Sequence, residues 1–146
     1  MQIHYYSEIT AFKNLVTPFL LQYEAENNLI LGLLERLEQN VYTFSETEKP
    51  VLIAIKRNNQ LELVSIRTPP KHNQLLSYTE NLETIKFLVD EMAKTTMDLP
   101  GVLGLNPIFL RQLCKELKSS SVLTIRSMSL VAGLRPSYIS TAPPIA

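Results

Sequence analysis

The fold of this chain is decided by residues 51–66, VLIAIKRNNQLELVSI. The first five, residues 51–55, form a continuous apolar run rich in β-branched side chains, which predicts a strand covered on both faces. Residues 57–60, Arg-Asn-Asn-Gln, favour a turn because asparagine tolerates positive φ angles. Residues 61–66 are then predicted to return beside the first strand, so the whole stretch is expected to form a hairpin.

Two amphipathic helices are expected before this hairpin, after a short first strand at residues 2–6. From Glu8 onward, apolar residues recur at three- and four-residue steps, as in a helix with one buried side; they are Phe12, Leu15, Val16, Phe19 and Leu20. Pro18 falls inside this pattern and predicts a kink or a break, because proline removes a backbone donor. The second helix has its apolar side at Leu29, Ile30, Leu33, Leu34 and Leu37, and residues 40–50 are predicted to form a polar loop.

A third strand and a third helix are expected after the hairpin. Thr68-Pro69-Pro70 ends the hairpin, because neither proline can donate to a strand ladder. Residues 74–78 are predicted to form the strand. Asn81 can cap the helix that follows, with Glu80 and Glu83 placed near its positive end.

The remaining sequence predicts a strand at residues 100–105, a helix that begins at Asn106-Pro107 and a last strand at residues 122–125. This order of elements predicts an α/β (α+β) fold. We expect a mixed sheet that is antiparallel and then turns parallel, flanked by helices on both faces. One domain is expected over residues 1–126, followed by an irregular, proline-containing tail over residues 127–146.

Composition excludes several classes of protein. The 14 basic and 14 acidic residues balance, and no basic stripe is present, so nucleic acid is not an expected partner. No run of 18 apolar residues exists, so no membrane partner is expected either. The single cysteine, Cys114, lies on the apolar side of its predicted helix, where no histidine or basic neighbour is arranged to lower its pKa, and it fits a buried, inert thiol in the cytoplasm. His72 has no second ligand at suitable spacing, so no metal site is expected.

Three motifs make the element order more specific. They are Glu24-Ala25-Glu26-Asn27-Asn28-Leu29-Ile30-Leu31-Gly32-Leu33, Arg67-Thr68-Pro69-Pro70 and Leu99-Pro100-Gly101-Val102-Leu103-Gly104. Together they resemble the N-terminal, degenerate half of a bacterial group of two-domain N-acetyltransferases of the GNAT family. In that group a second half carries the acetyl-CoA site. The resemblance covers roughly residues 8–118 and implies a catalytic GNAT domain, in cis or in trans, as partner; this chain does not contain it. The chain is then a natural single-domain version, a truncated product or a product with a frame-shifted end.

The resemblance also implies where acetyl-CoA would bind. In the family a glycine-rich loop between the fourth strand and the next helix surrounds the pyrophosphate with backbone N–H groups. The corresponding residues here, 76–82, contain no glycine, and none occurs between Gly32 and Gly101. Glu80 would put a carboxylate in the place of phosphate. No cofactor is therefore expected; if acetyl-CoA does bind, the candidate contacts in this loop are Tyr78, Thr79 and Asn81.

A few residues are candidates for catalysis or for substrate binding. The family often uses a tyrosine as general acid, and Tyr138 is the candidate, although a proline-rich tail does not favour a rigid role. Asn28, in a polar cluster at the start of the second helix, either faces a substrate or belongs to a solvated first turn. Arg67 and Thr68 either hold an anionic group or cap the end of a strand. His4 is either a base or an exposed strand residue.

Three functions follow from these observations. The first is a non-catalytic GNAT-like module that supports or shapes the substrate site of a catalytic domain. The second is an active, small, acetyl-CoA-dependent N-acetyltransferase with atypical phosphate contacts. The third is a homodimeric interaction module, in which an edge strand at residues 122–126 pairs with a second copy of the chain.

Overall fold

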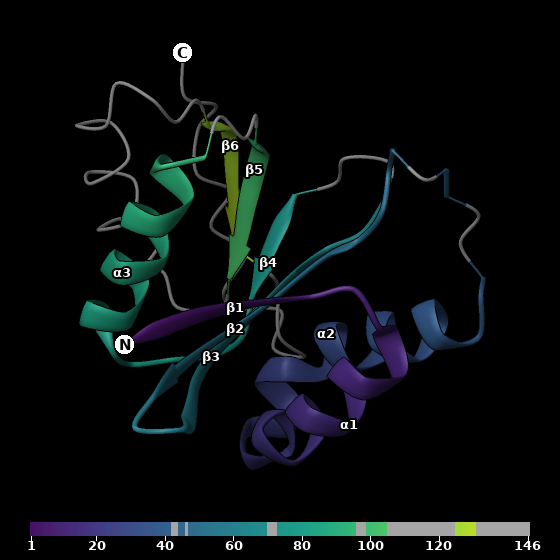
Figure 1. The fold of residues 1–146 in the computed structure, drawn as a ribbon, viewed down its shortest axis with the longest axis horizontal. Coiled ribbons are helices and arrows are strands. Elements are labelled where there is room, and N and C mark those ends of the chain that lie inside the picture. Colours follow the sequence, from purple (N-terminus) through teal and green to yellow (C-terminus); the bar gives the residue numbers. More distant parts are fainter. Residues whose placement is uncertain (42–43, 46, 70–72, 96–98, 105–124, 131–146) are drawn as a thin grey trace.

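Residues 1–41, 44–45, 47–69, 73–95, 99–104 and 125–130 are described by the computed structural model. Their strands form one six-stranded sheet in the order β1-β2-β3-β4-β5-β6 (Figure 1). The strands are β1 Gln2–Tyr6, β2 Val51–Arg57, β3 Gln60–Arg67, β4 Gln74–Leu76, β5 Leu99–Gly104 and β6 Ile125–Leu130. The helices are α1 Ile9–Leu20, α2 Glu24–Glu38 and α3 Leu82–Ala93, and a 3₁₀ turn, η1 Leu21–Tyr23, joins the first two.

The sheet changes character at β4. Strands β1 to β4 pair with their neighbours antiparallel, whereas β4 with β5 and β5 with β6 are parallel. Helix α3 connects β4 to β5, as a parallel pair requires a crossover. The expectation of a mixed sheet that is antiparallel and then turns parallel is confirmed.

Helices cover both faces of the sheet, with α1 and α2 on one side and α3 on the other (Figure 1). The first five residues of β2, 51–55, are apolar because both faces of the strand are covered there. Leu52 and Ala54 belong to the cluster with α1 and α2, whereas Ile53 and Ile55 belong to the cluster with α3. All four side chains are buried, and complete burial of one leucine or isoleucine side chain contributes about 1.5–3 kcal/mol. The prediction of a strand covered on both faces is confirmed.

The predicted hairpin is formed by β2 and β3. Its two-residue turn has φ angles of 48° at Asn58 and 66° at Asn59, which are the positive angles that the tight turn of a twisted hairpin requires. The register shifts after Ile55, because Ile55 pairs with Leu63 and Lys56 pairs with Leu61. Glu62 is therefore the extra residue of a β-bulge, and such a residue can change the direction of a side chain.

Several boundaries differ from the sequence-based expectations. Helix α1 continues through Pro18 and ends two residues later, where the chain tightens into η1. Strand β4 ends at Leu76 rather than at residue 78, and β6 continues to residue 130 rather than ending at 125. Residues 122–124 of the expected last strand lie outside the described residues. Residues 127–130 of the expected tail thus belong to a strand. The helix expected from Asn106 lies outside the described residues.

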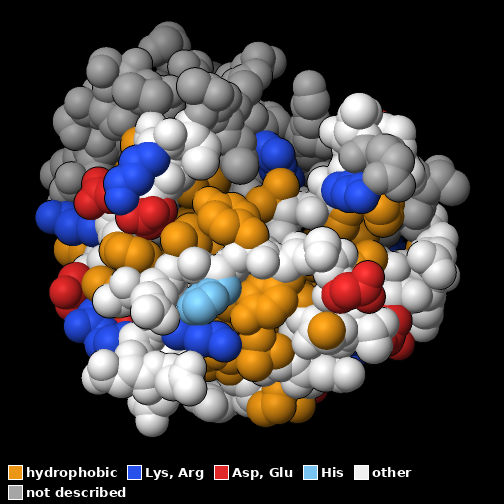
Figure 2. All heavy atoms as spheres, viewed as in Figure 1, with side chains coloured by type: hydrophobic (Ala, Val, Ile, Leu, Met, Phe, Trp, Pro, Cys, Tyr) orange, Lys and Arg blue, Asp and Glu red, His pale blue; other side chains and the backbone are white. Residues whose placement is uncertain are grey.

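Strand β1 forms one edge of the described sheet, because it pairs only with β2 there. On the face where β1 lies in Figure 1, hydrophobic side chains gather across the middle of the surface (Figure 2). Tyr5 of this strand is 52% exposed. None of the helices in the described part of the chain is long and apolar enough to cross a membrane.

Candidate functional site

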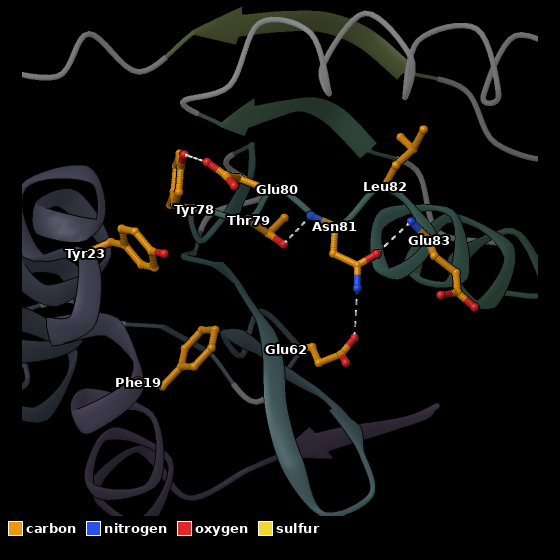
Figure 3. A pocket seen from close by; sticks show the side chains of 9 residues that line it. All are labelled: Phe19, Tyr23, Glu62, Tyr78, Thr79, Glu80, Asn81, Leu82 and Glu83. Atoms are coloured by element: carbon orange, nitrogen blue, oxygen red, sulfur yellow. Dashed lines mark hydrogen bonds between the residues drawn. The ribbon is translucent and has the colours of Figure 1, made fainter.

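An open hollow lies where the end of α1 and the turn η1 face the loop between β4 and α3 (Figure 3). Its volume is about 580 Å³, within the range of small-molecule sites. Phe19 and Tyr23 line it from the helical side. Residues 78–81 of the loop and the first two residues of α3 line it from the other side, and Glu62 lies below the loop on β3. The hollow is therefore built by segments far apart in the sequence.

A buried asparagine joins the two sides of this hollow. Asn27 of α2 is 2% exposed. Its side-chain nitrogen donates to the carbonyl oxygen of Leu20 at 3.0 Å, and its side-chain oxygen accepts from the backbone N–H of Tyr78 at 2.8 Å. Because a buried backbone group without a partner is costly, these two bonds fix the loop against the end of α1.

The bulge in β3 places a second polar anchor beneath the loop. Leu61 packs against the cluster of α1 and α2, and a strand without the bulge would place Glu62 rather than Leu61 on that face, together with Val64. Instead the Glu62 carboxylate accepts from the hydroxyl of Thr84 at 2.5 Å and from Arg57 Nε at 2.8 Å. Glu62 therefore joins the hairpin to the first turn of α3.

The N-terminus of α3 is closed by its own cap. The side-chain oxygen of Asn81 accepts from the backbone N–H groups of Glu83 at 3.0 Å and of Thr84 at 3.4 Å, and its nitrogen lies 3.4 Å from Glu62 Oε2. Both ends of the amide are in use, as Figure 3 shows. The predicted cap is confirmed, and these two N–H groups are no longer available to a ligand.

Negative charge surrounds this capped terminus. Glu62, Glu80 and Glu83 line the hollow, and no basic residue is among its described lining residues. Arg57 bonds Glu62 and, through Nη2, Glu83 at 2.8 Å. Three carboxylates against one guanidinium leave an excess of two negative charges.

Tyr78, near the start of the loop, is hydrogen-bonded to one of these carboxylates. Its hydroxyl donates to Glu80 Oε1 at 2.6 Å. This hydrogen bond, followed by burial and the charge of the carboxylate, raises the pKa of Tyr78 to about 12. Tyr78 is therefore protonated and neutral at every physiological pH.

Aromatic rings from both sides also line the hollow. The rings of Tyr23 and Tyr78 lie 4.8 Å apart between centroids and are tilted by 44°. Tyr23 is 49% exposed, and Phe19 lies next to it on the helical side (Figure 3). The hollow thus combines electron-rich ring faces with carboxylates.

The candidate residues from the sequence fall into two groups. Tyr78, Thr79 and Asn81 come together in the hollow. Arg67 and Thr68 lie at the other end of β3 from Glu62, roughly 17 Å away at 3.3 Å per strand residue. Asn28 is exposed on α2 and does not line the hollow.

Other candidates have no place in this site. His4 lies in β1, opposite Ala54, and its buried Nε2 has no hydrogen-bond partner within the described residues. Tyr138, Cys114 and His72 lie outside the described residues. No group of three or more potential ligands in the described part of the chain could hold a metal ion.

Sequence reasoning missed Glu62, Phe19 and Tyr23 as site residues, and from the polar cluster at the start of the second helix it selected Asn28 rather than Asn27. A signal for Asn27 was present, since it precedes the buried residues Ile30, Leu34 and Leu37 by three, seven and ten positions, on the buried stripe of α2. No comparable signal exists for Glu62, because its direction depends on the bulge.

Comparisons of the chain with protein-family models, with curated proteins and with solved structures found no match.

Proposed function

We propose that this chain is a GNAT-like domain without an acetyl-CoA site of its own, which supports or shapes the substrate site of a catalytic GNAT domain. The order of its elements supports this proposal. A hairpin, a short fourth strand, a crossover helix and a parallel fifth strand follow two N-terminal helices.

The pairing around β4 is a further point of support. Within the described residues, β4 pairs with β5 at Gln74 and Leu75 alone. Beyond these residues the chain continues along β3, because the N–H of Ser77 donates to the carbonyl oxygen of Val64 at 2.8 Å and the Ser77 hydroxyl accepts from the N–H of Val64. The loop that follows therefore separates from β5, which is consistent with the opening between these strands expected from the resemblance to the GNAT family.

The state of the α3 N-terminus is the observation that carries the proposal. A helix N-terminus attracts an anion by about 0.3–1 kcal/mol at an exposed site, but here Asn81 already accepts from the N–H groups of Glu83 and Thr84. A phosphate about 4 Å from Glu80, the lining carboxylate that Arg57 does not pair, would be repelled by about 4 kcal/mol at an effective dielectric constant of about 20. Repulsion exceeds attraction, so the pyrophosphate of acetyl-CoA is not expected to bind.

Calorimetric titration of the chain with acetyl-CoA tests this proposal. We expect no saturable heat at millimolar ligand, and no acetyl transfer to a mixture of amines. Saturable binding would overturn the proposal and favour an active acetyltransferase with atypical phosphate contacts.

A further inference from the structure

The hollow beside the α3 N-terminus has walls of two kinds. Phe19, Tyr23 and Tyr78 bring three aromatic rings to it, and Glu62, Glu80 and Glu83 bring three carboxylates. Arg57 pairs with Glu62 and Glu83, which leaves an excess of two negative charges. Aromatic faces and carboxylates both attract cations, and both disfavour anions. We propose that this hollow binds a small organic cation that carries an alkylammonium group.

Tyr23 is more exposed to solvent than a ring that serves only to pack against its neighbours needs to be. Tyr23 is half exposed although its ring contacts Tyr78, and its hydroxyl points toward the space in Figure 3. A cation over the face of a tyrosine ring is attracted more strongly when water is excluded from the contact. An alkylammonium group offers the charge together with methyl or methylene groups that cover the rings.

The hydroxyl proton of Tyr78 points to Glu80 and not to the cation that would bind in the hollow. Its proton is held by Glu80, so the side chain stays neutral and its ring remains a neutral π surface. The carboxylate of Glu80 accepts this hydrogen bond through Oε1 and lies at the rim of the hollow.

Two parts of the walls are held in place by the protein itself. Asn27 holds the backbone of Tyr78, and the β-bulge directs Glu62 toward Thr84 and Arg57. Fixed walls lower the cost of ordering side chains on binding. A volume of about 580 Å³ accommodates a ligand larger than a single ammonium ion.

Choline and its neutral isostere 3,3-dimethylbutan-1-ol provide a matched pair of probes, because they share shape and differ in charge. We expect choline to bind at least about tenfold more tightly than the isostere in titrations followed by NMR. Added salt should weaken choline binding, since the carboxylates are partly exposed. Equal affinity for the two probes would overturn the proposal.

Two substitutions locate the binding. Tyr23→Leu and Glu80→Gln are each expected to weaken choline binding by about threefold to tenfold. Their controls are Tyr5→Leu, an equally exposed tyrosine on β1, and Glu48→Gln, an exposed carboxylate in another loop. Circular dichroism and thermal unfolding check that every variant is folded. Unchanged affinity in both Tyr23→Leu and Glu80→Gln would also overturn the proposal.

A second ligand identifies the source of the ammonium group. Tighter binding of N-acetyl-lysine methylamide than of choline would assign the group to a lysine side chain of a partner, and the reverse order would assign it to a free small molecule. Choline binding and acetyl-CoA binding are separate measurements, so this proposal and the proposed function can fail independently.

Discussion

Replacement of Asn27 by alanine is expected to destabilise the fold by about 2–4 kcal/mol. The side chain is buried and satisfies two backbone groups, the carbonyl of Leu20 and the N–H of Tyr78. A buried polar group that loses its partner costs about 1–3 kcal/mol, so two such groups together cost about 2–6 kcal/mol. Because Tyr78 is partly exposed, the expected loss lies in the lower half of this range. Urea unfolding measures the loss; at a slope of about 2 kcal/mol/M the midpoint should fall by about 1–2 M.

The adjacent residue provides the control. Asn28 is exposed and has the same side chain, so Asn28→Ala is expected to change stability by less than about 0.5 kcal/mol. Equal effects of the two substitutions, both below about 0.5 kcal/mol, would refute the role of Asn27 as the link between α1, α2 and the loop.

Three further predictions concern the charges and the cap. Asn81→Ala should destabilise the fold by about 1 kcal/mol in urea unfolding, because the α3 cap is lost; no change would mean that the cap is not used. The hydrogen bond from Lys13 lowers the pKa of Glu35 from 4.5. Its stabilising contribution is therefore present above pH 4.5 and is lost as the pH falls through the lowered pKa, so Glu35→Gln should lose less stability than the wild type in that acid range. The pKa of Tyr78 is raised from 10.0 to about 12, so its contribution is present below pH 10 and is lost as the pH rises toward 12. Tyr78→Phe should remove a tyrosinate absorbance change near pH 12, and a removed change near pH 10 would contradict the hydrogen bond to Glu80.

The sheet and its two helical layers were predictable because the signals are local. Residues 51–55 are apolar at every position, and two asparagines mark the turn. Asn81 was predictable as a cap for the same reason, since a cap depends only on the residues of one helical turn. Strand ends were less predictable, as β4 and β6 show, because pairing partners decide where a ladder stops.

The site was predictable only on its loop side. Tyr78, Thr79 and Asn81 are neighbours in sequence, whereas Phe19 and Tyr23 reach the hollow through the packing of α1 and α2. Alternation along β3 assigns Glu62 to the face of Val64, and only the bulge reverses that assignment.

The most direct test of the central claim is the amide NMR spectrum of the chain during titration with acetyl-CoA. The N–H groups of Glu83 and Thr84 donate to Asn81 and not to a ligand. We predict that their resonances do not shift at millimolar acetyl-CoA. A saturable shift of these two resonances would contradict the claim that this helix N-terminus is closed to phosphate.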